Sequence, residues 1–181
     1  MLSTRVRMSG YRKDQLTYLY NEGNTFEAKT GGYKLAGFSR GSGNTFSLEL
    51  DHIHLRSSGS SNQTISMITT NSIDLSIYSK ALVTYMHNCT TTNNFTSYIG
   101  FFIDDGSWLP LHPTHGQLET WTNDITGSFL GVEEVQYLGQ VRTIEVPLTG
   151  ANQNLHFGGF LNQWTDSKTQ DLKIYKVELI G

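Results

Sequence analysis

The 181-residue chain has little proline, one cysteine and few basic side chains. Because Cys89 is the single cysteine, no disulfide can form within the chain, and we expect its thiol to lie in the core or in a loop. Lys and Arg number 13 against 16 Asp and Glu, a formal net charge of −3, and basic residues cluster only near the start, in "TRVRMSGYRK". A nucleic-acid groove needs clustered basic residues, so we expect no nucleic-acid partner.

Long hydrophobic runs and helical periodicity are also scarce. No window of 18 apolar residues occurs, so we expect no membrane-spanning segment. The apolar residues at 131–141 are spaced at nearly the period of an α-helix, but a strand with a bulge would explain their spacing equally well. No internal repeat is visible, which argues against propellers and solenoids.

The chain is instead rich in residues that favour strands and turns. It has 18 glycines and many Thr, Ser and Asn residues, of which Thr favours pleated surfaces and the others favour turns. Period-2 patterns predict strands at 16–20, 33–38, 44–58, 63–70, 80–88, 98–104, 143–148, 155–161 and 171–180. Short strands without helical crossovers predict an all-β, antiparallel jelly-roll β-sandwich over 16–181, after an arm or linker at 1–15.

The alternation changes parity inside the segment 44–58. Its apolar residues share one face up to residue 50 and the other face from residue 53 onward. They are Phe46, Leu48, Leu50, Ile53 and Leu55. Because side chains alternate strictly along a strand, we predict a bulge or break at Asp51–His52, with all five apolar side chains buried.

The segment 171–180 shows a similar change. Leu172 and Ile174 share one parity, whereas Val177 and Leu179 share the other. We therefore predict that this strand is bulged or is buried on both faces. In the segment "IDLSIYSK", Ile73, Leu75 and Ile77 are expected on one face, before a corner at Tyr78–Ser79 where the chain crosses between sheets.

Three segments resemble the β-sandwich domains at the ends of bacteriophage tail and baseplate proteins, especially of phages with Gram-positive hosts. They are "YLYNEGNTFEAKTGGY" (18–33), "NSIDLSIYSKALVTY" (71–85) and "DLKIYKVELIG" (171–181). In that family T-G-G is followed by Trp, whereas this chain has Tyr33. The resemblance implies a jelly-roll sandwich on the virion, at the tail tip or baseplate, that binds host-surface glycan and contacts other tail proteins. The resemblance is also compatible with a homotrimer.

The segment "NEGNTFEAKTGG" (21–32) does not fit a phosphate-binding loop, since no Lys-Ser/Thr follows its glycines. One interpretation is a turn in which Gly31 and Gly32 allow positive φ. The other is a structural calcium site. The resemblance implies the calcium site, because glycan-binding jelly rolls often hold calcium between the first loop and the last strand, which would bring Glu22 near Asp171. Further ligands would then be backbone carbonyls.

The segment "DHIHL" places His52 and His54 on one face of a strand, opposite Ile53 and Leu55. Paired imidazoles can bind a transition metal, particularly where copies meet on a trimer axis. The alternative is a pair of solvent-facing histidines, since no cysteine or carboxylate cluster completes a tetrahedral site in the sequence.

Catalytic motifs are weak, and we predict that the chain is not an enzyme. Carboxylates are paired at Asp104–Asp105 and Glu133–Glu134, but neighbours on a strand point to opposite faces and so cannot flank one glycosidic bond. No G-x-S-x-G motif is present. A glycoside hydrolase remains the less favoured alternative.

Three tryptophans lie in hydrophilic segments that we predict to be loops, beside Asp and Asn residues. A tryptophan ring packs on the C–H groups of a sugar while carboxylates and amides bind its hydroxyls. The predicted carbohydrate-binding residues are Trp108, Trp121, Asp124, Trp164 and Asp166. The alternative is that the rings cap the core, in which case the domain would be a purely structural part of the virion.

Overall fold

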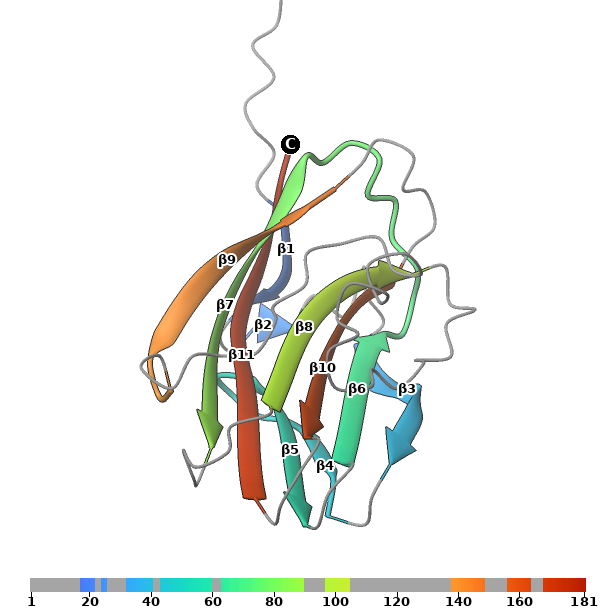
Figure 1. The fold of residues 1–181 in the computed structure, drawn as a ribbon. Helices are drawn as coiled ribbons and strands as arrows, with labels where there is room; N and C mark the ends of the chain where they lie inside the picture. Colours follow the sequence, from blue (N-terminus) through green and yellow to red (C-terminus); the bar gives the residue numbers. More distant parts are fainter. Residues whose placement is uncertain are drawn as a thin grey trace, which may run out of the picture.

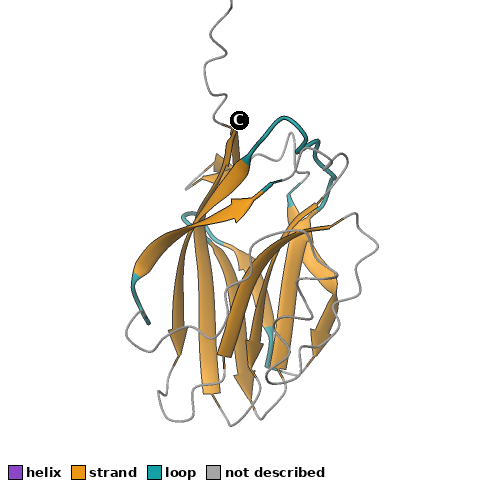
Figure 2. Ribbon diagram, turned by 45° about the horizontal axis from the view of Figure 1, so that its top comes forward, coloured by secondary structure: helices purple, strands orange, loops and turns teal. Residues whose placement is uncertain are grey.

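A computed structural model describes residues 17–21, 24–25, 32–40, 43–59, 63–89, 97–104, 138–148, 156–163 and 168–181. All secondary-structure elements in these ranges are β-strands, with no helix among them, and the strands form two antiparallel sheets (Figures 1 and 2). None of the described segments is a helix that could cross a membrane. The predicted arm at 1–15 lies outside the described residues.

The larger sheet is built around one long strand, β11. Its members are β1 (Thr17–Asn21), β2 (Asn24–Thr25), β4 (Thr45–Leu48), β5 (Ile53–Gly59), β7 (Lys80–Cys89), β9 (Val141–Pro147) and β11 (Lys168–Ile180). Strand β7 runs beside β11 from Gln170 to Ile180, whereas β5 and β1 pair with successive parts of β11. The outer strands β4, β9 and β2 then pair with β5, β7 and β1.

The smaller sheet has the order β3-β6-β10-β8. Its strands are β3 (Tyr33–Arg40), β6 (Gln63–Thr69), β8 (Ser97–Asp104) and β10 (His156–Gln163). It packs face to face with the larger sheet, as the views in Figures 1 and 2 show. The predicted antiparallel jelly-roll β-sandwich is confirmed, and each of the nine predicted strand segments overlaps a strand of the structure.

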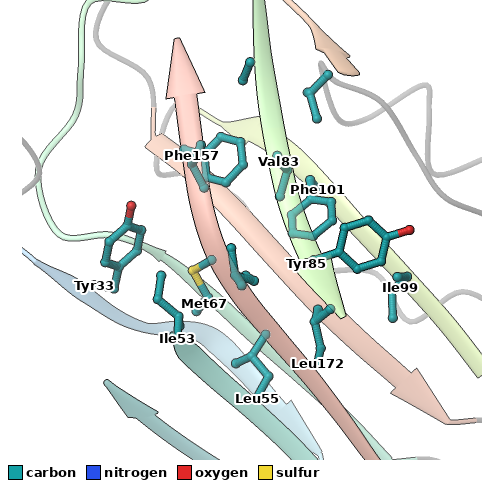
Figure 3. Close-up of a cluster of buried hydrophobic side chains, with 14 of the residues drawn as sticks. Tyr33, Ile53, Leu55, Met67, Val83, Tyr85, Ile99, Phe101, Phe157 and Leu172 are labelled. Carbon is teal, nitrogen blue, oxygen red and sulfur yellow. The ribbon is translucent and has the colours of Figure 1, made fainter. Parts of the chain in front are cut away.

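The core lies between the sheets and follows from the alternation of apolar residues. In β7, Ala81, Val83 and Tyr85 are buried, while the residues between them are partly exposed. Figure 3 shows Val83 and Tyr85 near Phe101 and Phe157 of the opposite sheet. The ring of Phe101 lies 5.6 Å from that of Tyr85 and 6.3 Å from that of Phe157, measured between centroids. Burial of these apolar surfaces is the main force that holds the sheets together.

The predicted break near Asp51–His52 is present, and it is a tight turn between two strands. Strand β4 ends at Leu48 and β5 begins at Ile53. The Glu49 amide donates a hydrogen bond of 2.9 Å to the His52 carbonyl, which leaves two residues at the tip of the hairpin. The turn, rather than a bulge in one continuous strand, causes the change of parity.

The prediction that all five apolar residues around this break are buried is wrong for two of them. Ile53 and Leu55 are fully buried, and Phe46 packs against the core. Leu50, however, is 89% exposed because it lies at the tip of the hairpin, and Leu48 is 42% exposed at the end of the short strand β4. Alternation defines a face, but it does not show where the opposite sheet ends.

The predicted irregularity in the last strand is a β-bulge. Ile174 pairs with Tyr85 and Lys176 with Thr84, so the register with β7 shifts by one residue at Tyr175. The extra residue restores the inward direction of the apolar side chains on both sides of the bulge. Those buried residues are Leu172, Ile174, Val177 and Leu179.

Residues 70–79 carry the chain from β6 in the smaller sheet to β7 in the larger sheet, as predicted. Ile73, Leu75 and Tyr78 are buried, but Ile77 is 58% exposed, so its predicted place on the same face is wrong. The Tyr78 amide donates to the Leu75 carbonyl at 3.1 Å. This turn interrupts the strand alternation and points Ile77 outward.

Only parts of the segment 18–33 are described, and they do not decide between the turn and the calcium site. Strands β1 and β2 form a hairpin in which Tyr20 faces Thr25 and Asn21 faces Asn24. Gly32, directly before β3, has a φ of 82°, a conformation that glycine adopts readily.

Candidate functional site

Most residues of the predicted sites lie outside the described part of the chain. This applies to Trp108, Trp121, Asp124, Trp164 and Asp166 and to the predicted calcium ligand Glu22. Their roles stay predictions. Asp171, the second predicted calcium ligand, lies in β11 and is described.

The carboxylate of Asp171 lies on the outer side of the larger sheet and interacts with β5. His54 Nε2 donates a hydrogen bond of 2.7 Å to Asp171 Oδ1, and Arg56 Nη1 lies 3.6 Å from the same oxygen. Strand β1 meets β11 farther along, where Tyr20 faces Val177. Among the described residues, no group of three or more His, Cys, Asp or Glu side chains could hold a metal ion. The calcium site therefore stays a prediction.

Asp171 belongs to a group of polar and aromatic side chains that we call the outer-face cluster. It consists of His52, His54, Arg56, Asp171 and Tyr175. The His52 ring lies 5.5 Å from the His54 ring and 5.8 Å from the Tyr175 ring, between centroids. The side chain of His52 is 12% exposed, and those of His54 and Asp171 are each 21% exposed. These groups are thus packed against one another while still reaching solvent.

Local sequence explains how the cluster forms. In β5, Ile53, Leu55 and Ser57 point into the core, so the residues between them, His54 and Arg56, point outward. Tyr175 is the extra residue of the β11 bulge, and its ring lies beside His52. The segment "DHIHLR" is thus the sequence signal for one half of the cluster, and the parity change in β11 is the signal for the other half.

Asp51 extends the cluster at the hairpin tip. His52 Nδ1 lies 2.6 Å from Asp51 Oδ1, so each histidine of the cluster has one ring nitrogen bonded to a carboxylate. The hydrogen bond from His52 lowers the pKa of Asp51 below its ordinary value. The carboxylate partners were not predicted from the sequence, because Asp171 is 117 residues away from His54.

A second polar group, also missed by the sequence analysis, is enclosed between the sheets. Ser57, His87 and Gln170 are all buried on the inward side of the larger sheet. His87 Nε2 and Gln170 Oε1 are 3.3 Å apart. Burial lowers the pKa of His87 from 6.5 to about 4, although the Gln170 contact and the charge of Asp171 oppose this shift. The inward parity that His87 shares with Val83 and Tyr85 could have indicated its burial.

The chemistry of the outer-face cluster suits binding better than catalysis. The imidazoles, the guanidinium and the carboxylates supply hydrogen-bond donors and acceptors, while Tyr175 adds an aromatic ring. The carboxylates of Asp51 and Asp171 are each bonded to a histidine. The arrangement can therefore bind a ligand with many hydroxyl groups.

No protein-family model matches the chain, and no curated protein matches it. Solved structures do match. The carbohydrate recognition domain of Emp46p, in its potassium-bound form, has a TM-score of 0.52 and 10% identity over 90% of this chain and 95% of that chain. A structure on the promiscuous specificity of carbohydrate-binding modules from the β-sandwich superfamily also has a TM-score of 0.52 and 10% identity, over 91% of this chain and 62% of that chain.

At these identities the likeness concerns the fold alone. The chain shares a β-sandwich fold with carbohydrate-binding modules. A family 29 module from Piromyces equi also matches, with 11% identity over 93% of this chain and 92% of that chain. Its TM-score is lower, at 0.46, and we draw no conclusion from it. None of these three neighbours is a phage tail protein, so the resemblance to tail and baseplate domains rests on the sequence motifs.

Proposed function

We propose that the chain is a non-catalytic carbohydrate-binding module that attaches a phage virion, through its tail tip or baseplate, to glycans on the host surface. The proposal of sugar binding rests on the outer-face cluster, in which an aromatic ring lies among charged and imidazole side chains on a rigid sheet. Ordered strands hold such groups in place at a low entropic cost of binding. The two neighbours with TM-scores of 0.52 are a carbohydrate recognition domain and a structure of carbohydrate-binding modules, which supports the same ligand class.

The chemistry of the cluster matches that of a sugar. Tyr175 offers a ring to the apolar C–H face of a pyranose. His54, Arg56 and Asp171 lie within one hydrogen-bonded network and can exchange bonds with vicinal hydroxyls, whose donors and acceptors alternate in the same way. The loop residues predicted around Trp121 and Trp164 would add further contacts to the sugar.

The alternative of a purely structural assembly domain predicts a wide apolar surface. In the described ranges, the exposed large apolar side chains are Leu48, Leu50, Ile77 and Val141. Leu48 and Leu50 belong to the β4–β5 hairpin, whereas Val141 begins β9, beyond β5, β11 and β7. Ile77 precedes the opposite end of β7. The scattered positions favour a polar ligand over an apolar protein interface.

The proposed location on the phage virion is supported by the three sequence motifs. It is tested by adding purified chain to host cells before phage infection. A module that recognises the host glycan should compete with the virion and reduce adsorption, and removal of cell-wall polysaccharide should abolish binding of the chain. Unchanged adsorption at saturating chain would contradict the virion role.

The binding site is tested with a glycan array followed by calorimetry on the best ligand. Tyr175→Ala should weaken binding by about 1–3 kcal/mol, by analogy with stacking of bases on aromatic rings. The matched control is Thr143→Ala, which changes an exposed side chain of β9 on the same sheet, away from the cluster. Equal affinity of Tyr175→Ala and the wild type would exclude the cluster as the sugar-binding site. If no glycan on the array is bound, the carbohydrate-binding function is rejected.

A further inference from the structure

The two histidines of the outer-face cluster share an unusual hydrogen-bonding arrangement. His52 uses Nδ1 to bond Asp51, whereas His54 uses Nε2 to bond Asp171, at 2.6 and 2.7 Å. A carboxylate accepts the bond, so in each neutral ring the proton lies on the nitrogen that faces the carboxylate. The other nitrogens, Nε2 of His52 and Nδ1 of His54, then carry lone pairs. A lone pair on a neutral imidazole is the form that binds a metal ion.

The spacing of the two rings fits coordination to one ion. Imidazole nitrogen binds zinc at about 2.0–2.1 Å, which places a ring centroid roughly 3.2 Å from the metal. Two such rings at a tetrahedral angle have centroids about 5.3 Å apart. In the structure the centroids of His52 and His54 are 5.5 Å apart, and the ring planes are inclined at 57°.

The carboxylates complete the pattern. Histidines that bind metals generally donate their second ring N–H to a carboxylate or carbonyl, which orients the ring and strengthens the ligand. Here each imidazole has its own carboxylate, and both rings are largely packed in the sheet surface, at 12% and 21% side-chain exposure. Little rearrangement is then needed when the ion binds.

We propose that His52 and His54 form a two-imidazole site for a divalent first-row transition metal, with Asp51 and Asp171 as positioning residues and water in the remaining coordination positions. The described residues offer no group of three or more His, Cys, Asp or Glu ligands, so the ion keeps open positions. Affinity should follow the order Cu²⁺ above Ni²⁺ and Zn²⁺. This inference does not depend on sugar binding.

The test is calorimetric titration of the full chain, first treated with chelator and dialysed, with Cu²⁺, Ni²⁺ and Zn²⁺ in the absence of carbohydrate. The wild type should bind one ion, and His52→Ala and His54→Ala should each weaken binding at least tenfold. Asp171→Asn keeps both imidazoles and should weaken it by about 10-fold or more, the usual effect of removing such a partner. The electron paramagnetic resonance spectrum of the Cu²⁺ form should show coupling to two nitrogens.

The matched control is His156→Ala, which removes an imidazole from β10, where His156 Nδ1 bonds the Thr69 carbonyl. It should leave the affinity unchanged, and thermal melts of all variants should verify folding. A His52→Ala/His54→Ala double variant that binds as tightly as the wild type would overturn the site. Wild-type affinity in Asp171→Asn would overturn the positioning role. Loss of metal binding in His52→Ala with sugar affinity retained would support the metal site and leave the proposed function intact, because His52 is not among the side chains proposed to bond the sugar hydroxyls.

Discussion

The ring of Phe160 lies directly against Gly100. The two residues are paired across β10 and β8, and a β-carbon placed on residue 100 would be 2.2 Å from Cε1 and 2.5 Å from Cζ of the ring. Phe160 is fully buried, although its neighbours Phe157 and Leu161 point to the opposite side, into the main core. Glycine at residue 100 is therefore required by the aromatic ring that occupies the place of its side chain.

Gly100→Ala should consequently destabilise the fold. The new methyl group must displace a buried ring, and such overpacking costs about 1–3 kcal/mol. Urea denaturation should show this loss as a lower midpoint with little change in slope. Gly159→Ala is the matched control, because its β-carbon would lie 3.2 Å from the flexible end of Met67 and 3.3 Å from the ring of Phe101, and neither contact is as short as that at Gly100. If both variants lose the same stability, the close contact with Phe160 is not the cause.

The buried histidine should make stability depend on pH. The pKa of His87 is 6.5 unfolded and about 4 folded, so below pH 6.5 the unfolded chain binds a proton that the folded chain does not. This contribution is absent above pH 6.5 and destabilises progressively down to pH 4, approaching about 3 kcal/mol. Denaturation of the wild type and His87→Asn at pH 7, 5.5 and 4.5 measures it. The variant should show a shallower decline, and parallel declines would contradict the assignment.

The predicted calcium site can be separated from the transition-metal site. If Glu22 and Asp171 bind calcium, excess calcium should raise the melting temperature relative to EGTA. At a calcium concentration of 100 times Kd, the gain in folding stability is about 3 kcal/mol. Glu22→Gln leaves both histidines in place and should remove the calcium effect. An identical melt with calcium and with EGTA would mean that 21–32 is an ordinary turn region.

The loop tryptophans make a further prediction about binding. Trp121→Ala or Trp164→Ala should weaken glycan binding by roughly 1–3 kcal/mol, as stacking contacts do, with an almost unchanged melting temperature. Calorimetry and a thermal melt on the same samples check both parts. A large loss of stability with unchanged glycan affinity would show instead that the rings cap the core.

Sequence patterns predicted the strands well because each strand has one apolar and one polar face. The alternation in β7 and the parity change at Ile174–Val177 needed only local information, and both are confirmed. Exposure at the ends of strands was harder to predict. Leu50 and Ile77 continue an apolar pattern into a turn, and a local pattern does not show that the opposite sheet is no longer above them.

The candidate site was only partly visible in the sequence. The outward histidines followed from "DHIHL", but their partner Asp171 lies on a strand far away in the chain. Which strands lie side by side depends on the order of strands in the sheet, and alternation within one strand carries no information about that order. The burial of Ser57 and Gln170 was missed for the same reason, since both are polar and face inward beside each other across β5 and β11.

The bulge at Tyr175 marks a position where the gene can lose one codon without changing the faces of β11. Because Ile174 pairs with Tyr85 and Lys176 with the next residue of β7, Thr84, deleting residue 175 would remove the bulge and leave Ile174, Val177 and Leu179 facing inward. A substitution at the same position changes only the outer-face cluster. A codon deletion at this position should thus keep the apolar face of β11 in the core and, like a point mutation there, mainly alter what the surface binds.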